Sequence, residues 1–445
     1  MKFIPFVYCV CLFLFPSGTR AQSGDPLLKD SGFSFHFQFT GVIQYHPDFH
    51  SSYSGKNSFQ AAAEKAYSVT TTAYIGRKLW RGGSIYFDPE MAGGEGLSQT
   101  LGIAGFPNGE TFRIGEPKTV VYVARVFIRQ QFSLDGQHMV DLEDGPNQVK
   151  ERVSTSRITI TAGKFGMADF FDQNAVSHDP RSDFMNWAMM NNGAYDYAAN
   201  TRGYTGGIVV EYYRPGWVLR AATALLPEYA NGPTLNFNYA KTNEETVELE
   251  KDYSIQKHPG SARLLFYYNT SKAPAYRQVI NDFNSGADPS MDVIYGKQYG
   301  GNKFGVGLNA DQELGERLKA FFRAGWNDGK TATWAFAEID NTVSTGLRYY
   351  GIGRNRTADN IGIALLSNGI SKDHRDFLNA GGYGFMLGDG KLPEYAREDI
   401  AEFFYQVKLF EFVYASADYQ FVLHPGYNPD RGPVHLFAAR VHVSF

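Results

Sequence analysis

The chain has 445 residues, of which 43% are hydrophobic, 15% aromatic and 20% charged, and it contains 47 Gly but only 2 Cys. This composition excludes a disordered, collagen-like or disulfide-stapled protein. The formal net charge of −4 also argues against nucleic acid as a partner, because binding to phosphate backbones requires an excess of basic residues.

The first residues have the features of an export signal. Lys2 precedes an apolar stretch over residues 4–15, and a polar exit ends at Ala21. We therefore expect residues 1–21 to be a signal peptide and residues 22–445 to form a single domain. Both cysteines, Cys9 and Cys11, fall within this leader, so we expect neither a disulfide nor a thiolate metal site in the exported chain.

No later segment reaches about 18 uninterrupted apolar residues, the length that a membrane-spanning helix needs. Instead, apolar and polar residues alternate in short segments. In residues 434–445 the odd positions from Phe437 to Phe445 are apolar, whereas Arg440, His442 and Ser444 occupy even positions. Such a strand presents one face to lipid and the other to water, which indicates a membrane β-barrel.

The same alternation recurs along the chain and is divided by turn residues. We predict a hairpin that turns at residues 214–216, where Pro and Gly favour a tight turn, and a second that turns at residues 313–316. The segments 135–152, 169–203 and 227–260 are long and polar, which predicts long external loops opposite short periplasmic turns. Residues 59–67 are expected to form a short amphipathic helix.

A soluble β-sandwich or β-propeller would also alternate apolar and polar residues. Three features favour the barrel: apolar faces that end in aromatic residues, Arg, Glu and Asp on the opposite face, and a final residue, Phe445, on the apolar face. The sequence therefore predicts an all-β, transmembrane antiparallel barrel.

Several blocks are not required by this periodicity. They are GRKLW (76–80), GGSIYFDPE (82–90), GLSQTLGIAGFPNGE (96–110), HDPRSDFMNWA (178–188), YDYAANTRGYTGG (195–207) and the ending at residues 418–445. Together they closely resemble the carbohydrate-selective porin family, OprB, over nearly the whole exported chain. The resemblance is weaker between residues 227 and 292, and Arg202 and Gly206 stand where aromatic residues are expected.

This resemblance implies a 16-stranded, monomeric barrel in the outer membrane of a Gram-negative bacterium, through which small sugars diffuse. It also implies contact with outer-membrane lipid, and recognition of Phe445 by the barrel assembly machinery. No cofactor is expected, and the protein is not expected to be an enzyme.

A sugar is neutral and rich in hydroxyl groups, so a selective pore should offer both hydrogen-bond donors and acceptors. Strand parity predicts which polar side chains face the lumen. The candidates are Arg125, Arg129, Arg157, Glu211, Arg220, Arg263, Arg323, Glu402, Asp418, Gln420, Arg440 and His442. The alternative for each is a structural ion pair that holds the wall or fastens a loop.

A second set lies in the segment 164–187, which combines charges with aromatic residues and is predicted to fold inward as a constriction. Its candidates are Lys164, Asp169, Asp172, Asp179, Arg181, Asn186 and Trp187. The oxygen-bearing residues Asp169, Asp172, Asn174 and Asp179 could also hold calcium, but their spacing matches no known calcium loop, so no metal site is predicted.

Two other functions remain open. A barrel hydrolase would need a nucleophile, a base and an orienting group at one rim, yet no GxSxG motif occurs. A general porin or a polysaccharide exporter would share the barrel; an exporter of acidic polymers should have a mainly basic lumen, whereas Glu211, Glu402 and Asp418 share this one.

Overall fold

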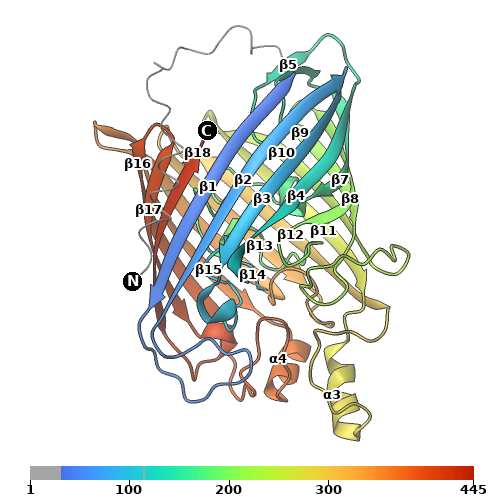
Figure 1. Cartoon of the computed structure of the whole chain (residues 1–445), viewed down its shortest axis with the longest axis vertical. Coiled ribbons are helices and arrows are strands. Elements are labelled where there is room, and N and C mark those ends of the chain that lie inside the picture. Colours follow the sequence, from blue (N-terminus) through green and yellow to red (C-terminus); the bar gives the residue numbers. More distant parts are fainter. Residues whose placement is uncertain (1–31, 114–115) are drawn as a thin grey trace.

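The computed structural model describes residues 32–113 and 116–445, so the predicted signal peptide lies outside the described residues. Among the described residues, 16 strands close into one antiparallel barrel (Figure 1). These strands are β1 (Phe33–His46), β2 (Glu64–Trp80), β3 (Gly83–Gly94), β4 (Glu116–Ser133), β7 (Arg157–Phe165), β8 (Thr205–Arg214), β9 (Trp217–Ala224), β10 (Asn243–Ile255), β11 (His258–Ser271), β12 (Gly301–Glu313), β13 (Leu318–Asn327), β14 (Asn341–Ile352), β15 (Arg356–Gly369), β16 (Glu398–Phe410), β17 (Val413–Leu423) and β18 (Val434–Ser444). The predicted fold class is confirmed.

Neighbouring strands in the sequence pair with one another, and the barrel closes where β18 pairs with β1. The closing register places Gln38 opposite Ser444 and Tyr45 opposite Phe437. Beyond the last strand residue, Phe37 and Phe445 exchange two backbone hydrogen bonds of 3.0 and 3.1 Å. Closure leaves no open edge in this sheet, which is the condition for strands to cross a bilayer.

The alternation along the strands separates an apolar outer face from a polar lumen. In β18, Phe437 and Val441 are exposed, while Leu436, Arg440 and His442 are buried, as predicted. The pairing register of β3 and β4 shifts between Asp88 and Pro89 of β3. A bulge therefore keeps Arg125 in the lumen while Val126 becomes an outward residue.

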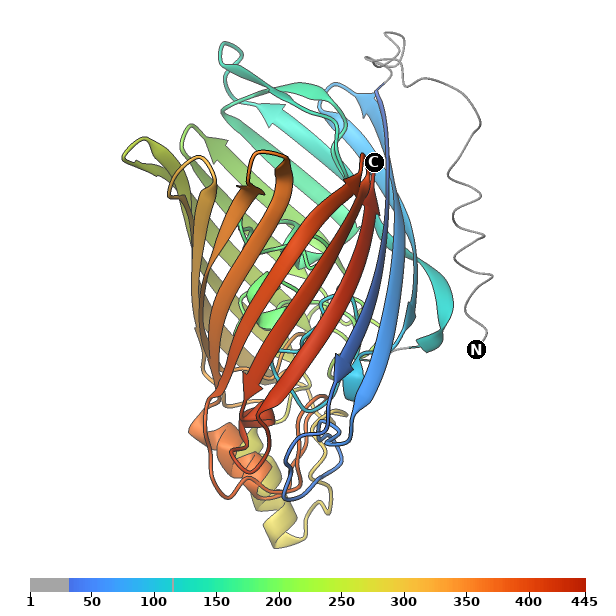
Figure 2. The same cartoon turned by 90° about the vertical axis from the view of Figure 1, so that its left-hand side faces the viewer.

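The two ends of the barrel differ. The connections β2–β3, β8–β9, β10–β11 and β16–β17 are two residues long and lie at one end, here named the turn end. The connections 47–63, 272–300 and 370–397 lie at the opposite end, here named the loop end, together with α3 (Tyr276–Ser285) and α4 (Lys372–Asn379) (Figure 2). Among the described residues, no helix has the length and apolar character to span a membrane.

Both predicted hairpins are present, with turns at residues 215–216 and 314–317. Three predicted details are wrong. The segment 135–152 lies at the turn end, where it carries the small hairpin of β5 (Met139–Leu142) and β6 (Glu151–Ser154). The segment 227–260 contains strand β10, whose repeated glutamates looked like a polar loop. Residues 59–67 form no helix, because Glu64 already begins β2, whose residues pair with β1.

The buried apolar core lies inside the barrel rather than between two layers. The connection between β7 and β8, residues 166–204, runs within the bore (Figure 2). We call it the inner loop. It carries η2 (Met167–Asp169) and α2 (Trp187–Met190), and it packs Phe184 between Phe321 and Phe404 of the wall. The preceding long connection, residues 95–113, contributes Ile103 and Phe106 to the same core.

Candidate solute path and inner loop

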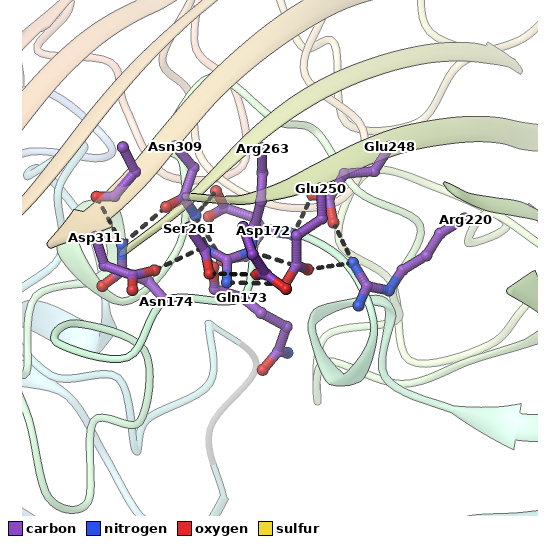
Figure 3. A network of polar contacts seen from close by, with 12 residues as sticks. Asp172, Gln173, Asn174, Arg220, Glu248, Glu250, Ser261, Arg263, Asn309 and Asp311 are labelled. Atoms are coloured by element: carbon purple, nitrogen blue, oxygen red, sulfur yellow. Dashed lines mark hydrogen bonds and ion pairs between the residues drawn. The ribbon is translucent and has the colours of Figure 1, made fainter. Parts of the chain in front are cut away.

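The inner loop is fastened to the far wall of the barrel by buried polar contacts. Arg323 of β13 forms an ion pair of 3.0 Å with Asp172, and its Nη1 donates to the carbonyl of Met189 at 2.6 Å. Figure 3 shows Asp172 among the polar residues of β10 to β12. The Glu402 carboxylate of β16 accepts from the backbone N–H groups of Met185 and Asn186 at 2.5 and 3.1 Å. These wall side chains therefore position the loop.

Small residues let the loop approach this wall closely. Gly307 and Gly325 face the lumen on β12 and β13, and a Cβ atom on either would lie within 2.9 Å of the Asn192 side chain. The Asn192 amide instead donates to the Ala324 carbonyl at 3.0 Å. A larger residue at either glycine would displace the loop from the wall.

Two predicted lumen arginines, Arg220 and Arg263, belong to a ladder of ion pairs around Glu248 and Glu250 (Figure 3), and a third is connected to it. Arg220 contacts Glu211 at 3.2 Å, Glu248 at 3.1 Å and Glu250 at 2.6 Å. Arg263 continues the ladder to Glu250 at 3.2 Å and to Asp311 at 2.7 Å. The third arginine, Arg323, joins it through Asp172, whose backbone N–H donates to Glu248 at 2.8 Å. Cross-strand ion pairs of this kind hold the wall and the loop together.

The predicted residues near the chain end also contact the inner loop or its neighbours. Gln420 accepts from the Asn186 amide at 3.1 Å and donates to the Pro107 carbonyl at 3.0 Å. Asp418 accepts from Gln420 at 3.2 Å. Arg440 donates to the carbonyls of Pro180 and Asp183 in the inner loop. His442 lies 2.9 Å from the Thr40 hydroxyl across the closing seam of the barrel.

The residues predicted for the constriction divide between strand and loop. Lys164 lies in β7, one residue before the strand ends, and its Nζ donates to the Val123 carbonyl at 2.6 Å. The inner loop therefore begins two residues later than the predicted segment. Trp187 donates to the Asn108 carbonyl at 2.8 Å and stacks on Phe336. The Asn186 amide donates to the Gly105 carbonyl at 2.7 Å and caps α2.

The four residues considered for calcium each contact protein partners, and two of them, Asp172 and Asn174, share Asn309. Asp169 pairs with Arg125 at 2.6 Å, Asp172 with Arg323, and Asn174 with Asn309 at 2.8 Å, while Asp179 accepts from the backbone N–H of Arg181 at 2.9 Å. In the described part of the chain, no three His, Cys, Asp or Glu residues come together as metal ligands.

On the opposite side of the bore, charged and phenolic side chains gather around Glu90 of β3. Its carboxylate accepts from Tyr122 at 2.5 Å, from Thr72 at 2.6 Å and from Tyr204 at 3.0 Å. Arg181 of the inner loop lies 3.0 Å from Glu110 and 3.9 Å from Glu90. We call Glu90, Glu110, Tyr122, Arg181 and Tyr204 the lumen cluster.

Two cations border this cluster. The Arg125 guanidinium lies over the Tyr204 ring at 5.1 Å, and the Arg202 guanidinium over the Tyr122 ring at 4.0 Å. Burial alone would lower the pKa of Arg181, but Glu110 and the other nearby acids raise it above its ordinary value. Arg181 therefore stays charged, although its side chain is only 18% exposed. The cluster offers donors and acceptors within one short stretch of the bore.

The sequence reasoning missed Glu90, Glu110, Tyr122, Arg202 and Tyr204. Residues 82–90 were singled out only for their resemblance to the OprB family, and Pro89 occupies the register shift between β3 and β4, where a missing N–H is tolerated. Period-two counting on β3 could have placed Asp88 and Glu90 in the lumen. Glu110 and Tyr204 lie in long connections, where periodicity carries no information.

A family model described as the carbohydrate-selective porin, OprB family, matches residues 61–445. The chain belongs to this family. A comparison with curated proteins found no match. OprB-family membership agrees with the barrel and the mixed polarity of the lumen.

Solved structures share the fold. The high-pH structure of OprB from Pseudomonas putida has a TM-score of 0.71 at 16% identity and covers 94% of this chain and 96% of that one. Its low-pH structure has a TM-score of 0.51 at 13% identity and covers 94% of each chain. The outer membrane channel DcaP of Acinetobacter baumannii has a TM-score of 0.50 at 10% identity and covers 94% and 99%.

Proposed function

We propose that the protein is a channel through which small sugars diffuse passively across the outer membrane of a Gram-negative bacterium. The observation that carries this function is the family match over residues 61–445. A closed barrel of 16 strands agrees with it, because a barrel of this size encloses an aqueous channel that loops can narrow. Porin family and fold favour a channel rather than an enzyme.

We further propose that sugars pass the lumen cluster. The Arg181 guanidinium can donate to sugar hydroxyls, the Glu110 carboxylate can accept from them, and the Tyr122 and Tyr204 rings add apolar surface for the C–H face of the sugar. Charges of both signs suit a neutral polyol better than an ion of either sign. Weak contacts at several points favour passage, because the solute must also leave.

The other predicted partners are part of the same proposal. The outward Phe, Leu, Ile and Val residues contact outer-membrane lipid, the chain acts as a monomer, and the barrel assembly machinery reads Phe445. Phe445 is 45% exposed and lies 5.4 Å from the Phe37 ring, so its side chain is accessible at the end of the closing strand.

Liposome swelling tests the channel. Vesicles that contain the purified protein should swell in arabinose and glucose, more slowly in disaccharides, and little in a large dextran. Absence of swelling in every neutral sugar contradicts the proposal. Equal rates for neutral sugars and for charged solutes of the same size would indicate a general porin instead.

Arg181→Ala tests the lumen cluster. Removing hydrogen bonds made by a charged donor should change the glucose rate by about tenfold relative to glycerol, since such bonds contribute about 1.5–3 kcal/mol. The control is Arg317→Ala, because Arg317 donates to the Gly351 carbonyl between two tight turns, away from the cluster. Equal changes in both variants would place the selective contacts elsewhere.

A further inference from the structure

A separate cavity of about 510 Å³ lies between the inner loop and the turn end of the barrel. Its wall residues come from β2, β4, β7 and β8, and they include Gln131, Thr159 and Tyr213 near the turn end. Asp169, Gln173 and His178 of the inner loop line its other side. A volume of this order is typical of small-molecule sites. We call this cavity the vestibule.

The connection 134–156 covers part of the vestibule. This segment contributes Pro146, Asn147 and Gln148 to the lining. It is held across the turn end by an ion pair of 3.4 Å between Lys78 and Glu151, and by the hydrogen bond of 3.3 Å that the Val149 backbone donates to Tyr86. The cover is therefore tied to the barrel wall at two strands.

Several polar atoms of the lining have no partner among the described residues. They are Oγ1 of Thr159, Oε1 of Gln131, Oδ1 of Asn147 and Nε of Arg157, and each of these atoms is buried. Thr159 is only 3% exposed, so its hydroxyl group lies in the interior of the barrel. Buried polar groups are normally hydrogen-bonded. Several unpaired groups beside one cavity therefore call for an explanation, such as a ligand that supplies the missing partners.

Three arginines line the vestibule, and one of them, Arg125, pairs with Asp169 and Asp88. The other two are arranged differently from the arginines of the ion-pair ladder. Arg129 donates to the Asn147 carbonyl at 3.0 Å and lies 5.1 Å from the centre of the Tyr86 ring. The Arg157 guanidinium lies 3.6 Å from the centre of the Tyr213 ring. Within the described ranges, neither arginine forms an ion pair with a carboxylate. Their remaining N–H groups can therefore donate to a ligand.

We propose that the vestibule is a second sugar site, which holds a neutral sugar of one or two rings after it has passed the lumen cluster. Arg129 and Arg157 donate to its hydroxyl oxygens, while Thr159, Gln131 and Asn147 accept from its hydroxyl groups. A simple anion lacks hydrogens to donate and would leave both amide oxygens unpaired, so a polyol fits the lining better. This inference rests on the proposed sugar channel and deepens it.

Cysteine protection tests the site without relying on transport. Gln148→Cys places a thiol in the vestibule, and Glu316→Cys places one on a tight turn outside it; in both variants Cys9 and Cys11 are replaced by Ser. D-glucose should slow the reaction of the vestibule thiol with a methanethiosulfonate reagent about fourfold at three times the Kd, since the free fraction falls as 1/(1 + [L]/Kd). The thiol at position 316 should react at an unchanged rate.

Two changes that replace hydrogen-bonding side chains by apolar ones then connect protection to the proposed contacts. Thr159→Val together with Gln131→Leu should abolish protection by glucose while the rate without sugar stays the same. Retained protection would overturn the site, as would slowing of the thiol at position 316 to the same extent. Stronger protection by gluconate than by glucose would assign the vestibule to sugar acids and contradict the neutral-sugar proposal.

Liposome swelling with the same proteins separates the two proposals. Swelling in glucose without protection of the vestibule thiol would leave the channel standing and reject the second site. Protection without swelling would support a sugar site in the barrel and reject the channel.

Discussion

The guanidinium of Arg323 meets the carboxylate of Asp172 at 3.0 Å, with side-chain exposures of 0% and 4%, and so joins wall strand β13 to the inner loop. Breaking one side of a buried pair leaves an uncompensated charge. We therefore expect Arg323→Leu to destabilise the protein by about 3–5 kcal/mol. Guanidinium unfolding in lipid vesicles measures the loss, and hydrogen exchange of residues 166–204 locates it.

The control for this prediction is Lys319→Met. Lys319 and Glu313 form an ion pair of 2.7 Å beside a tight turn, where both side chains are about a third exposed. Such exposed pairs contribute about 0–1 kcal/mol. Equal losses in the two variants would contradict the role of Arg323 in fastening the loop.

Gly325→Val tests the close approach of the inner loop to the wall. A Cβ atom at this position would lie 2.0 Å from the Asn192 Oδ1, so the loop must move away from β13. We expect the barrel to assemble while its single-channel conductance changes. Gly315→Val is the control, because a Cβ atom there meets no neighbour within 4 Å in the part of the chain that the structure describes. Unchanged conductance in Gly325→Val would show that the loop position does not govern the current.

The assignment of the outer face to lipid can be tested with arginine substitutions at two depths in the bilayer. Leu249 lies near the middle of β10 and is 45% exposed, whereas Ile255 ends the same strand on the same face and is 56% exposed. Arginine costs about 2–4 kcal/mol at the bilayer midplane and about 0–1 kcal/mol near the interface. Leu249→Arg should therefore reduce folding free energy in vesicles much more than Ile255→Arg. Similar losses would refute the assignment of this face to lipid.

Low pH should loosen α4 from the neighbouring loop. Asp340 accepts from the Ser371 N–H at 2.8 Å and lies 3.1 Å from His374. Burial alone would raise the pKa of Asp340, but His374, Lys303 and the Ser371 N–H together hold it below its ordinary value. Its stabilisation is thus complete above the ordinary carboxyl pKa of about 3.9 and is lost as pH falls through the lower folded value.

Hydrogen exchange of the α4 amides, corrected for intrinsic rates, measures this effect. Protection should fall below about pH 4 in the natural protein. In Asp340→Asn it should already be low at pH 7 and depend little on pH. A parallel fall in both proteins would assign the transition to another carboxyl group.

Deleting Phe445 should lower the amount of protein in the outer membrane. The terminal ring is exposed for recognition, and the backbone of Phe445 also adds two hydrogen bonds to the closing pair of strands. Heat-modifiable migration of membrane fractions measures the assembled protein. Phe445→Tyr keeps the ring and the backbone and serves as the control. Normal levels after deletion would reject recognition of this residue.

The sequence predicts the barrel well because period-two alternation is local. The inward positions of Arg263, Arg323 and Arg440 follow directly from their strands, and each is buried in the lumen. Their partners could not be predicted, since Arg323 and Asp172 are separated by 151 residues and meet only when the loop enters the bore. Residues 135–152 were assigned to the wrong end because length alone does not reveal on which side a connection emerges.

The lumen-facing glycines of β12 and β13 have a consequence for the shape of the water-filled space. They let the inner loop pack closely against β12 and β13, while the vestibule lies between part of this loop and β2, β4, β7 and β8. The route is thus off-centre, with arginines and tyrosines along its free side. A sugar that follows this route contacts mainly that side of the bore. Solute preference can therefore be engineered there, while the strands that hold the inner loop are left unchanged.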